Sequence, residues 1–208
     1  MERFRTPGRR WATRRHCTGH NQGMTDPASL PNIVRPLLRA RQVREFTDQA
    51  LTDAELEAIT DVARWTGSSR NTQPWRFLVI RDQNTIARLE AAGLPQTRAL
   101  KTATAVVAIV LPDDPERRVS HAYDDGRAAE RMLIAAGMLG VAAGIAWVRP
   151  DVLPAAREIL DLPADRMVRT LMALGHPTPE AQKPKSPPGQ ARLPRHETVF
   201  DAEWPEAE

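Results

Sequence analysis

Apolar residues follow two different spacings along this chain, and each spacing predicts its own kind of element. A spacing of three to four residues predicts helices over 33–38, from the Thr52-x-x-Glu55 capping box to Gly67, over 83–92, over 122–139, and from about 151 onward. Short continuous apolar runs predict buried strands over 77–80, 105–111, 145–148 and 167–174. Helices and strands therefore alternate through most of the sequence.

The inner faces of these elements can be proposed from the same pattern. In the helix after Thr52 the apolar residues Leu56, Ile59, Val62 and Ala63 are predicted to face the core. The run 105–111 is apolar at every position, as in a strand covered on both faces. From 176 to 194 the chain is rich in proline and polar residues, which predicts an extended arm. By itself the alternation of helices and strands favours a doubly wound parallel sheet.

The stretch Gly67-Ser-Ser-Arg-Asn-Thr-Gln-Pro-Trp75 lies between a predicted helix and a predicted strand. Small and amide-bearing residues pack poorly in a core, because each polar group needs a hydrogen-bond partner. They are suited to a loop that places amides along a polar, planar ligand. Pro74 favours an extended backbone at Gln73, and we expect Trp75 to enter the core.

A second stretch, Arg39-Ala-Arg-Gln-Val-Arg-Glu-Phe46, gathers three guanidinium groups at the end of the first predicted helix. The planar fork of arginine pairs with two phosphate oxygens at once, so this cluster is a candidate phosphate site. A solvated basic helix end is the alternative interpretation of the same residues.

Together the two stretches resemble the FMN-dependent nitroreductase family, whose pattern runs Arg-Arg-Ser-x-Arg-x-Phe and, after a helix, Pro-Ser-x-x-Asn-x-Gln-Pro-Trp. The second motif is matched by Ser68, Asn71, Gln73, Pro74 and Trp75, with Gly67 in the place of proline. The first is matched by Arg41, Arg44 and Phe46, whereas Ala40 and Gln42 replace the first arginine and the serine. The resemblance extends from about Ile33 to Val199.

This resemblance implies an α+β fold rather than the parallel one: a nitroreductase-like sandwich with a mixed, mainly antiparallel sheet flanked by helices, in an intertwined homodimer. It implies that Arg41 and Arg44 pair with the phosphate of FMN and that Gln42 forms a hydrogen bond near the phosphate or the ring edge. Arg192, or alternatively Arg195, would be a further phosphate contact. Ser68, Asn71 and Gln73 would contact the ribityl chain and the pyrimidine edge. Backbone amides of Ala146 and Trp147 would face the flavin ring.

The function that the resemblance implies is reduction of bound FMN by NADH or NADPH, followed by reduction of an electron-poor small molecule such as a nitroaromatic or quinone. Such ping-pong exchange needs no catalytic acid–base pair, since the flavin carries the chemistry. Other chemistries found among relatives are alternatives: dehalogenation, flavin cleavage and deazaflavin-linked reduction. A flavin-binding or redox-sensing module without turnover is another.

The charge of the chain is concentrated at its start. Residues 1–23 hold six arginines and one glutamate, and the remaining residues hold 23 basic and 25 acidic side chains, so the sequence pI near 9.6 comes from this segment. We expect residues 1–28 to be a disordered basic tail and 29–208 to be the FMN-binding domain, with the arm starting at about 176. A start of translation at Met24 is one hypothesis for the tail. The domain itself carries no excess of positive charge, so we expect no nucleic-acid partner.

Several other classes of protein and of functional site lack support in the sequence. Cys17 is the only cysteine, which excludes an internal disulfide and favours a cytoplasmic location. His16, Cys17 and His20 provide three metal ligands without a fourth, so we expect no metal site. No apolar run reaches the length of a membrane span. Dinucleotide-binding, Walker A and hydrolase-elbow motifs are absent, and no histidine forms a recognisable triad with Ser68 or Ser69.

Overall fold

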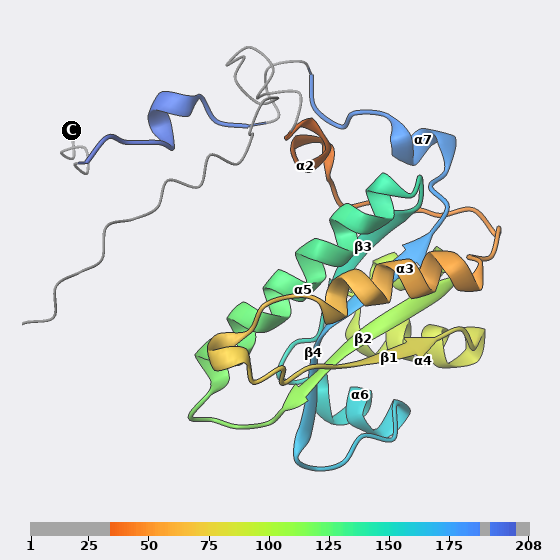
Figure 1. Ribbon diagram of the computed structural model, residues 1–208. Helices are drawn as coiled ribbons and strands as arrows, with labels where there is room; N and C mark the ends of the chain where they lie inside the picture. The colour runs from red at the N-terminus through yellow and green to blue at the C-terminus, as the bar shows by residue number, and fades with distance from the viewer. Residues whose placement is uncertain (1–33, 188–191, 203–208) are drawn as a thin grey trace, which may run out of the picture. The chain divides into compact units, whose positions relative to one another are not determined.

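A four-stranded sheet lies at the centre of the protein (Figure 1). The computed structural model describes residues 34–187 and 192–202. The strands are β1 (Arg76–Ile80), β2 (Ala105–Pro112), β3 (Ala142–Trp147) and β4 (Arg166–Gly175), in the spatial order β1-β2-β4-β3. All three neighbouring pairs are antiparallel. The antiparallel α+β arrangement is thus confirmed over the generic parallel one.

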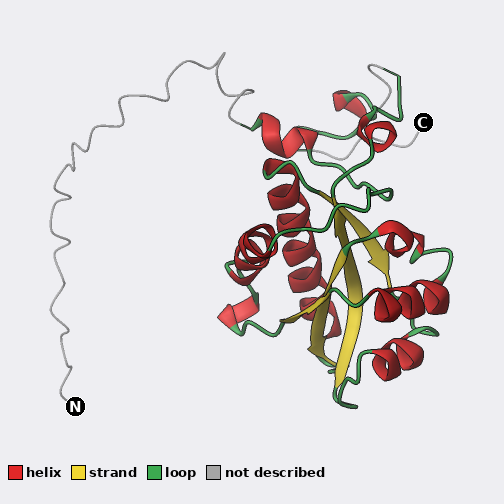
Figure 2. Ribbon diagram, turned by 90° about the vertical axis from the view of Figure 1, so that its right-hand side faces the viewer, coloured by secondary structure: helices red, strands yellow, loops and turns green. Residues whose placement is uncertain are grey.

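Helices cover both faces of the sheet (Figure 2). The described α-helices are α2 (Arg35–Arg39), α3 (Asp53–Arg64), α4 (Gln83–Gly93), α5 (Arg118–Met138), α6 (Leu153–Ile159) and α7 (Pro179–Gln182), of which α3, α4, α5 and α6 pack on the sheet. Short 3-10 turns occupy η2 (Ser69–Asn71), η3 (Arg98–Thr102) and η4 (Arg195–Glu197). Helices α3 and α5 share one buried cluster with the sheet, and α4 and α6 share the other.

Strand β2 explains why the core lies on both sides of the sheet. Successive side chains of a strand point to opposite faces. Val106 and Ala108 belong to the cluster under α4 and α6, whereas Val107 and Ile109 belong to the cluster under α3 and α5. All four are fully buried, as expected for the continuous apolar run.

Three predicted apolar surfaces are more exposed than the pattern indicated. Strand β1 was expected to be buried, but Leu78 and Val79 are 37% and 40% exposed, because β1 is an edge strand that pairs with β2 alone. Val62 of α3 is exposed although it was assigned to the inner face. Helix α2 buries none of its residues, and its Leu37 and Leu38 face solvent.

Element boundaries differ from the predicted ones at several ends. Helix α5 begins at Arg118 and β3 at Ala142, each three or four residues earlier than predicted. The arm is not wholly extended, because Thr178 accepts a hydrogen bond from the Ala181 amide and caps the short helix α7. The predicted tail and the histidines and cysteine within it lie outside the described residues. No described helix has the length and apolar composition needed to cross a membrane.

Candidate functional site

Residues 39–46, which we term the basic segment, are held against the sheet by backbone and apolar contacts. The Val43 amide donates to the Ala143 carbonyl oxygen at 2.8 Å, and Phe46 forms a β-bridge with Pro177. Val43 and Phe46 are both buried. A Cβ on Gly144 would lie 2.2 Å from the Val43 carbonyl oxygen, so the segment approaches β3 at a point that only glycine allows.

The polar side chains of the basic segment remain at the surface. Arg41 donates from Nη2 to the carbonyl oxygens of Ala181 and Gln182, at 2.8 and 2.5 Å. Gln42 Oε1 accepts from the Arg44 guanidinium and from the Ile145 amide, each at 3.3 Å. Among the described residues no carboxylate forms an ion pair with Arg41 or Arg44. Two cations therefore have their charge available for an external anion.

Residues 67–75, which we term the amide loop, fold through local polar contacts. Arg70, Asn71 and Gln73 have φ values of 51°, 54° and 48°, in the left-handed region that costs energy for residues other than glycine. The Gln73 amide donates to Ser68 Oγ at 2.8 Å, and the Gln73 side chain donates to Asn71 Oδ1 at 3.3 Å. Trp75 is buried, as predicted, and ends the loop in the core.

A buried carboxylate fixes the start of the amide loop. The Ser69 amide donates to the two carboxylate oxygens of Asp124 at 3.1 and 3.3 Å, and Asp124 is only 1% exposed. Arg127 Nη1 lies 3.9 Å from the same carboxylate. Sequence reasoning missed Asp124. The sequence signal that could have identified it is the pair Asp124-Asp125, because two acidic residues lie in a helix whose neighbouring residues face the core.

Asp125 faces the sheet rather than the loop. Its Oδ2 accepts from Thr170 Oγ1 of β4 at 2.7 Å. Burial raises the pKa of Asp125 to about 6, although the Thr170 hydrogen bond and the positive charge of Arg169 act in the opposite direction. The pairing of β2 with β4 shifts by one residue here, and Arg169 is the extra residue of this bulge.

The outer edge of β3 carries one of the two backbone amides expected to face a flavin. The Ala143 carbonyl and the Ile145 amide point away from β4, toward the basic segment, whereas Val148 bonds to Arg169 of β4. Alternation along the strand therefore directs the Trp147 amide outward and the Ala146 amide into the ladder. Ala146 is also completely buried. The prediction for Ala146 conflicts with this geometry, and Trp147, which is half-exposed, remains a candidate.

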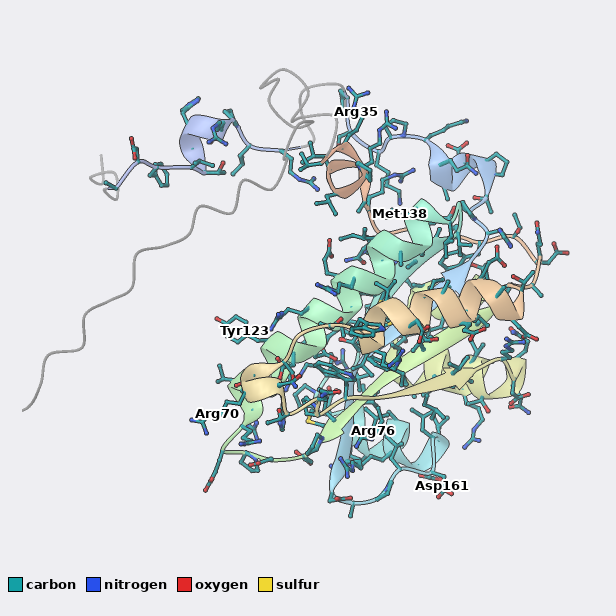
Figure 3. All side chains as sticks on the ribbon, viewed as in Figure 1. Arg35, Arg70, Arg76, Tyr123, Met138 and Asp161 are labelled. Carbon is teal, nitrogen blue, oxygen red and sulfur yellow. The ribbon has the colours of Figure 1, made fainter. Side chains whose placement is uncertain are left out.

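The two motifs lie at opposite ends of α5. A pocket of about 340 Å³ joins Arg41 and Val43 to Gly137 and Met138 at the end of the helix, whereas the amide loop is bonded to Asp124 near its start. Figure 3 shows Arg70 and Tyr123 at one end of α5 and Met138 at the other. At 1.5 Å per residue, positions 124 and 137 are about 20 Å apart. One chain thus does not bring Arg41 and Arg44 together with Asn71 and Gln73.

The remaining predicted residue, Arg192, is exposed and lies in a bend just before η4. Sequence reasoning placed it beside the phosphate through the family resemblance alone. Contact between Arg192 and the phosphate of FMN stays a prediction.

Comparison with known proteins identifies the family. The Nitroreductase family model matches residues 37–110, which contain the basic segment and the amide loop. A protein from Archaeoglobus fulgidus, named for NADH dehydrogenase and NAD(P)H nitroreductase activity, is 31% identical over 160 residues that cover 73% of this chain and 88% of that protein.

The chain belongs to the nitroreductase family.

Solved nitroreductase structures share the fold described above. A crystal structure from Desulfovibrio desulfuricans, named as a nitroreductase in complex with FMN, is 26% identical, with a TM-score of 0.67 over 83% of this chain and 98% of that chain. A structure from Clostridium difficile, named as an FMN-dependent nitroreductase, is 21% identical, with a TM-score of 0.72 over 82% and 99% of the two chains. The family expected from the two motifs is therefore confirmed.

Proposed function

We propose that this protein is an FMN-dependent NAD(P)H oxidoreductase whose flavin site is shared between two subunits of a homodimer. The observation that carries this proposal is the placement of two complementary half-sites at opposite ends of α5. One half-site offers the guanidinium groups of Arg41 and Arg44, which pair with no carboxylate of the described residues, and the other offers amides on a strained, fixed loop. The choice of FMN as cofactor and of NAD(P)H as electron donor follows from the names of the relatives reported above.

The hydrogen-bond donors of the two half-sites suit FMN. Arg41 uses only Nη2 for the α7 carbonyls, which leaves Nη1 and Nε for a phosphate, and Arg44 and the more distant Arg192 add positive charge. Gln42 would lie between the phosphate and the ring. Ser68, Asn71 and Gln73 would contact ribityl hydroxyls and the pyrimidine edge, which needs both donors and acceptors.

The protein's part in the reaction is to bind and orient. FMN, when bound, would accept a hydride from nicotinamide and then reduce an electron-poor acceptor such as a nitroaromatic or quinone. The Trp147 amide on the outer edge of β3 would donate a hydrogen bond to the ring and favour negative charge there. An open site that donor and acceptor occupy in turn accounts for ping-pong exchange without an acid–base pair.

A two-fold dimer would unite the half-sites. The outward face of α5 exposes Val119, Tyr123 and Met138, each more than 70% exposed. If two copies pack α5 on α5 in antiparallel directions, the basic segment of each subunit lies beside the amide loop of the other. Two-fold symmetry then generates two equal sites from one kind of contact. The intertwined homodimer that the family resemblance implies would meet this requirement.

Complementation between two defective subunits tests the shared site. Arg44→Ala and Asn71→Ala are each expected to lose bound flavin as homodimers. A heterodimer of the two variants contains one site with both defects and one intact site, so it should bind about one flavin. If Arg44 and Asn71 served the same flavin within one chain, each site of the heterodimer would carry a defect and flavin binding would not recover. Differently tagged subunits allow the heterodimer to be isolated, and absorbance gives its flavin content.

The absorption spectrum of the freshly purified protein tests the activity itself. Flavin bands that bleach on addition of NADH or NADPH and return with a nitroaromatic are the expected result. A yellow protein that neither nucleotide bleaches would be a flavin-binding module without turnover, and a colourless protein that ignores added FMN would refute the proposal.

A further inference from the structure

A second pocket, of about 250 Å³, lies at the N-terminal end of α5 beside the amide loop. Its walls come from five separate parts of the chain: Gln73 of the loop, Arg76 of β1, the connection between β2 and α5, His121 of α5, and Arg166 of β4. Figure 3 labels Arg76 at this end of the sheet. None of the flavin contacts proposed above, apart from Gln73, belongs to it.

The charge of this pocket is strongly positive. Arg76, Arg117 and Arg166 line it, against a single carboxylate, Asp114, whose Oδ1 already accepts from the Glu116 amide at 2.9 Å. Arg166 Nε lies 3.6 Å from Asp165 Oδ2, at the surface. Three guanidiniums at one small pocket repel each other, and a bound anion relieves that repulsion.

Two of the three guanidinium groups of the pocket have no carboxylate partner in the part of the chain that the structure describes. The Arg76 side chain donates from Nη1 to the carbonyl oxygens of Gln73 and Trp75, at 3.2 and 2.8 Å, and to no carboxylate of a described residue. Arg117 makes no side-chain hydrogen bond or ion pair with any residue in 34–187 or 192–202. Arg76 and Arg117 thus lie at one pocket without an acidic partner among the described residues, whereas Arg166 has one in Asp165.

His121 is the buried member of the lining. It is 4% exposed, and its Nδ1 has no hydrogen-bond partner among the described residues. Buried polar atoms are nearly always hydrogen-bonded, so an unsatisfied one marks a place where a ligand or an ordered water completes the structure. His121 lines the same pocket as the three arginines, and this observation does not depend on their charges.

We propose that this pocket binds an anionic group, a carboxylate or a phosphate, of the small molecule that reacts at the neighbouring flavin. The inference rests on the proposed function, because Gln73 is the residue that the pocket shares with the flavin site. Such a pocket would make the protein selective for anionic ligands. The anion would belong either to a carboxylate-bearing acceptor or to the phosphates of the nicotinamide nucleotide.

Binding of simple anions tests the pocket without any turnover. Benzoate and inorganic phosphate are titrated calorimetrically into the purified protein. Arg117→Gln and Arg166→Gln should each weaken binding of at least one of these anions about tenfold, the effect of losing one charge-assisted hydrogen bond. The matched control is Arg118→Gln, which removes the same charge from the adjacent residue, whose side chain lines a different pocket. Equal weakening by Arg117→Gln and Arg118→Gln, or no binding by the wild type, would overturn the proposal.

Steady-state kinetics then show whether the bound anion belongs to the acceptor or to the nicotinamide nucleotide. The KM values of wild type and Arg117→Gln are measured for two acceptors, 4-nitrobenzoate and the neutral 4-nitrobenzyl alcohol. They are also measured for two donors, NADH and reduced nicotinamide riboside, which has no phosphate. A KM raised about tenfold for nitrobenzoate alone assigns the pocket to the acceptor, and one raised for NADH alone assigns it to the donor. Unchanged KM values for all four compounds contradict the proposal. A wild type that reduces neither nitro compound refutes the proposed acceptor chemistry instead, and the titrations still decide whether the pocket binds anions.

Discussion

The basic segment and the amide loop are held in place by different forces. Val43 and Phe46 bury apolar side chains under the end of the sheet, and the backbone of the basic segment pairs with β3 and with the chain after β4. The amide loop instead combines left-handed backbone conformations with hydrogen bonds to Ser68 and Asp124. The first half-site is part of the core, and the second is a polar structure attached to it.

Because the two half-sites are held in place differently, we expect substitutions in the basic segment to change the stability of the fold and substitutions in the amide loop to change ligand binding. Removing an apolar anchor of the basic segment should destabilise the whole fold, since a core cavity costs several kcal/mol. Removing a polar anchor of the amide loop should mainly loosen the loop, because its residues bury little apolar surface. Substitutions at the two ends of α5 therefore test whether the half-sites differ as the contacts indicate.

The largest effect is expected at the core anchor of the basic segment. Phe46→Ala should lower the free energy of unfolding by about 4 kcal/mol, because it removes a buried aromatic ring that packs on Gly175. Urea unfolding followed by circular dichroism measures the change. Trp65→Ala, at an exposed position, should leave stability nearly unchanged. A similar small effect at Phe46 would mean that polar contacts hold the basic segment as well.

A smaller effect, dependent on pH, is expected at the loop end of α5. The pKa of Asp125 is about 6 in the folded protein and 3.8 as its ordinary value, so the folded state holds its proton more tightly. Stability therefore falls as pH rises from about 4 to about 6, and the penalty is fully present above that range. Its size is about 2 to 3 kcal/mol.

Unfolding of wild type and Asp125→Asn between pH 4 and pH 8 measures this term. The variant keeps an oxygen that accepts from Thr170 but cannot ionise, so its stability relative to wild type should increase with pH. A difference that stays constant across this range would show that Asp125 does not titrate with a raised pKa.

The smallest effect on stability, with a clear effect on binding, is expected at Asp124. Asp124→Ala removes the acceptor for the Ser69 amide and should weaken FMN binding about tenfold, measured by quenching of flavin fluorescence. Asp124→Asn retains an acceptor oxygen and should bind FMN almost as well as wild type. Comparable weakening by both variants would show that charge, rather than the hydrogen bond to the loop, is what matters at this position.

Much of the fold and part of the site could be predicted from local patterns. The apolar run 105–111 and the capping box at Thr52 predicted β2 and α3 because these signals depend on nearby residues only. The motif residues from Ser68 to Trp75 were recognised for the same reason. Asp124 and His121 were not singled out, since nothing in their neighbouring sequence shows that the loop and β4 fold over that face of α5.

The sequence by itself determined the positions of the elements, the family and the residues that carry its two motifs, because periodicity and motif spacing are properties of the linear chain. Only the tertiary structure decided that the motifs lie about 20 Å apart along α5, that the Ala146 amide belongs to the ladder, and that three arginines line one pocket. Strand order, the side of a strand to which each amide points and the direction of a long helix all depend on contacts between residues distant in sequence. Those contacts place the two half-sites at opposite ends of one helix, which is the reason for our proposal that a second subunit joins them.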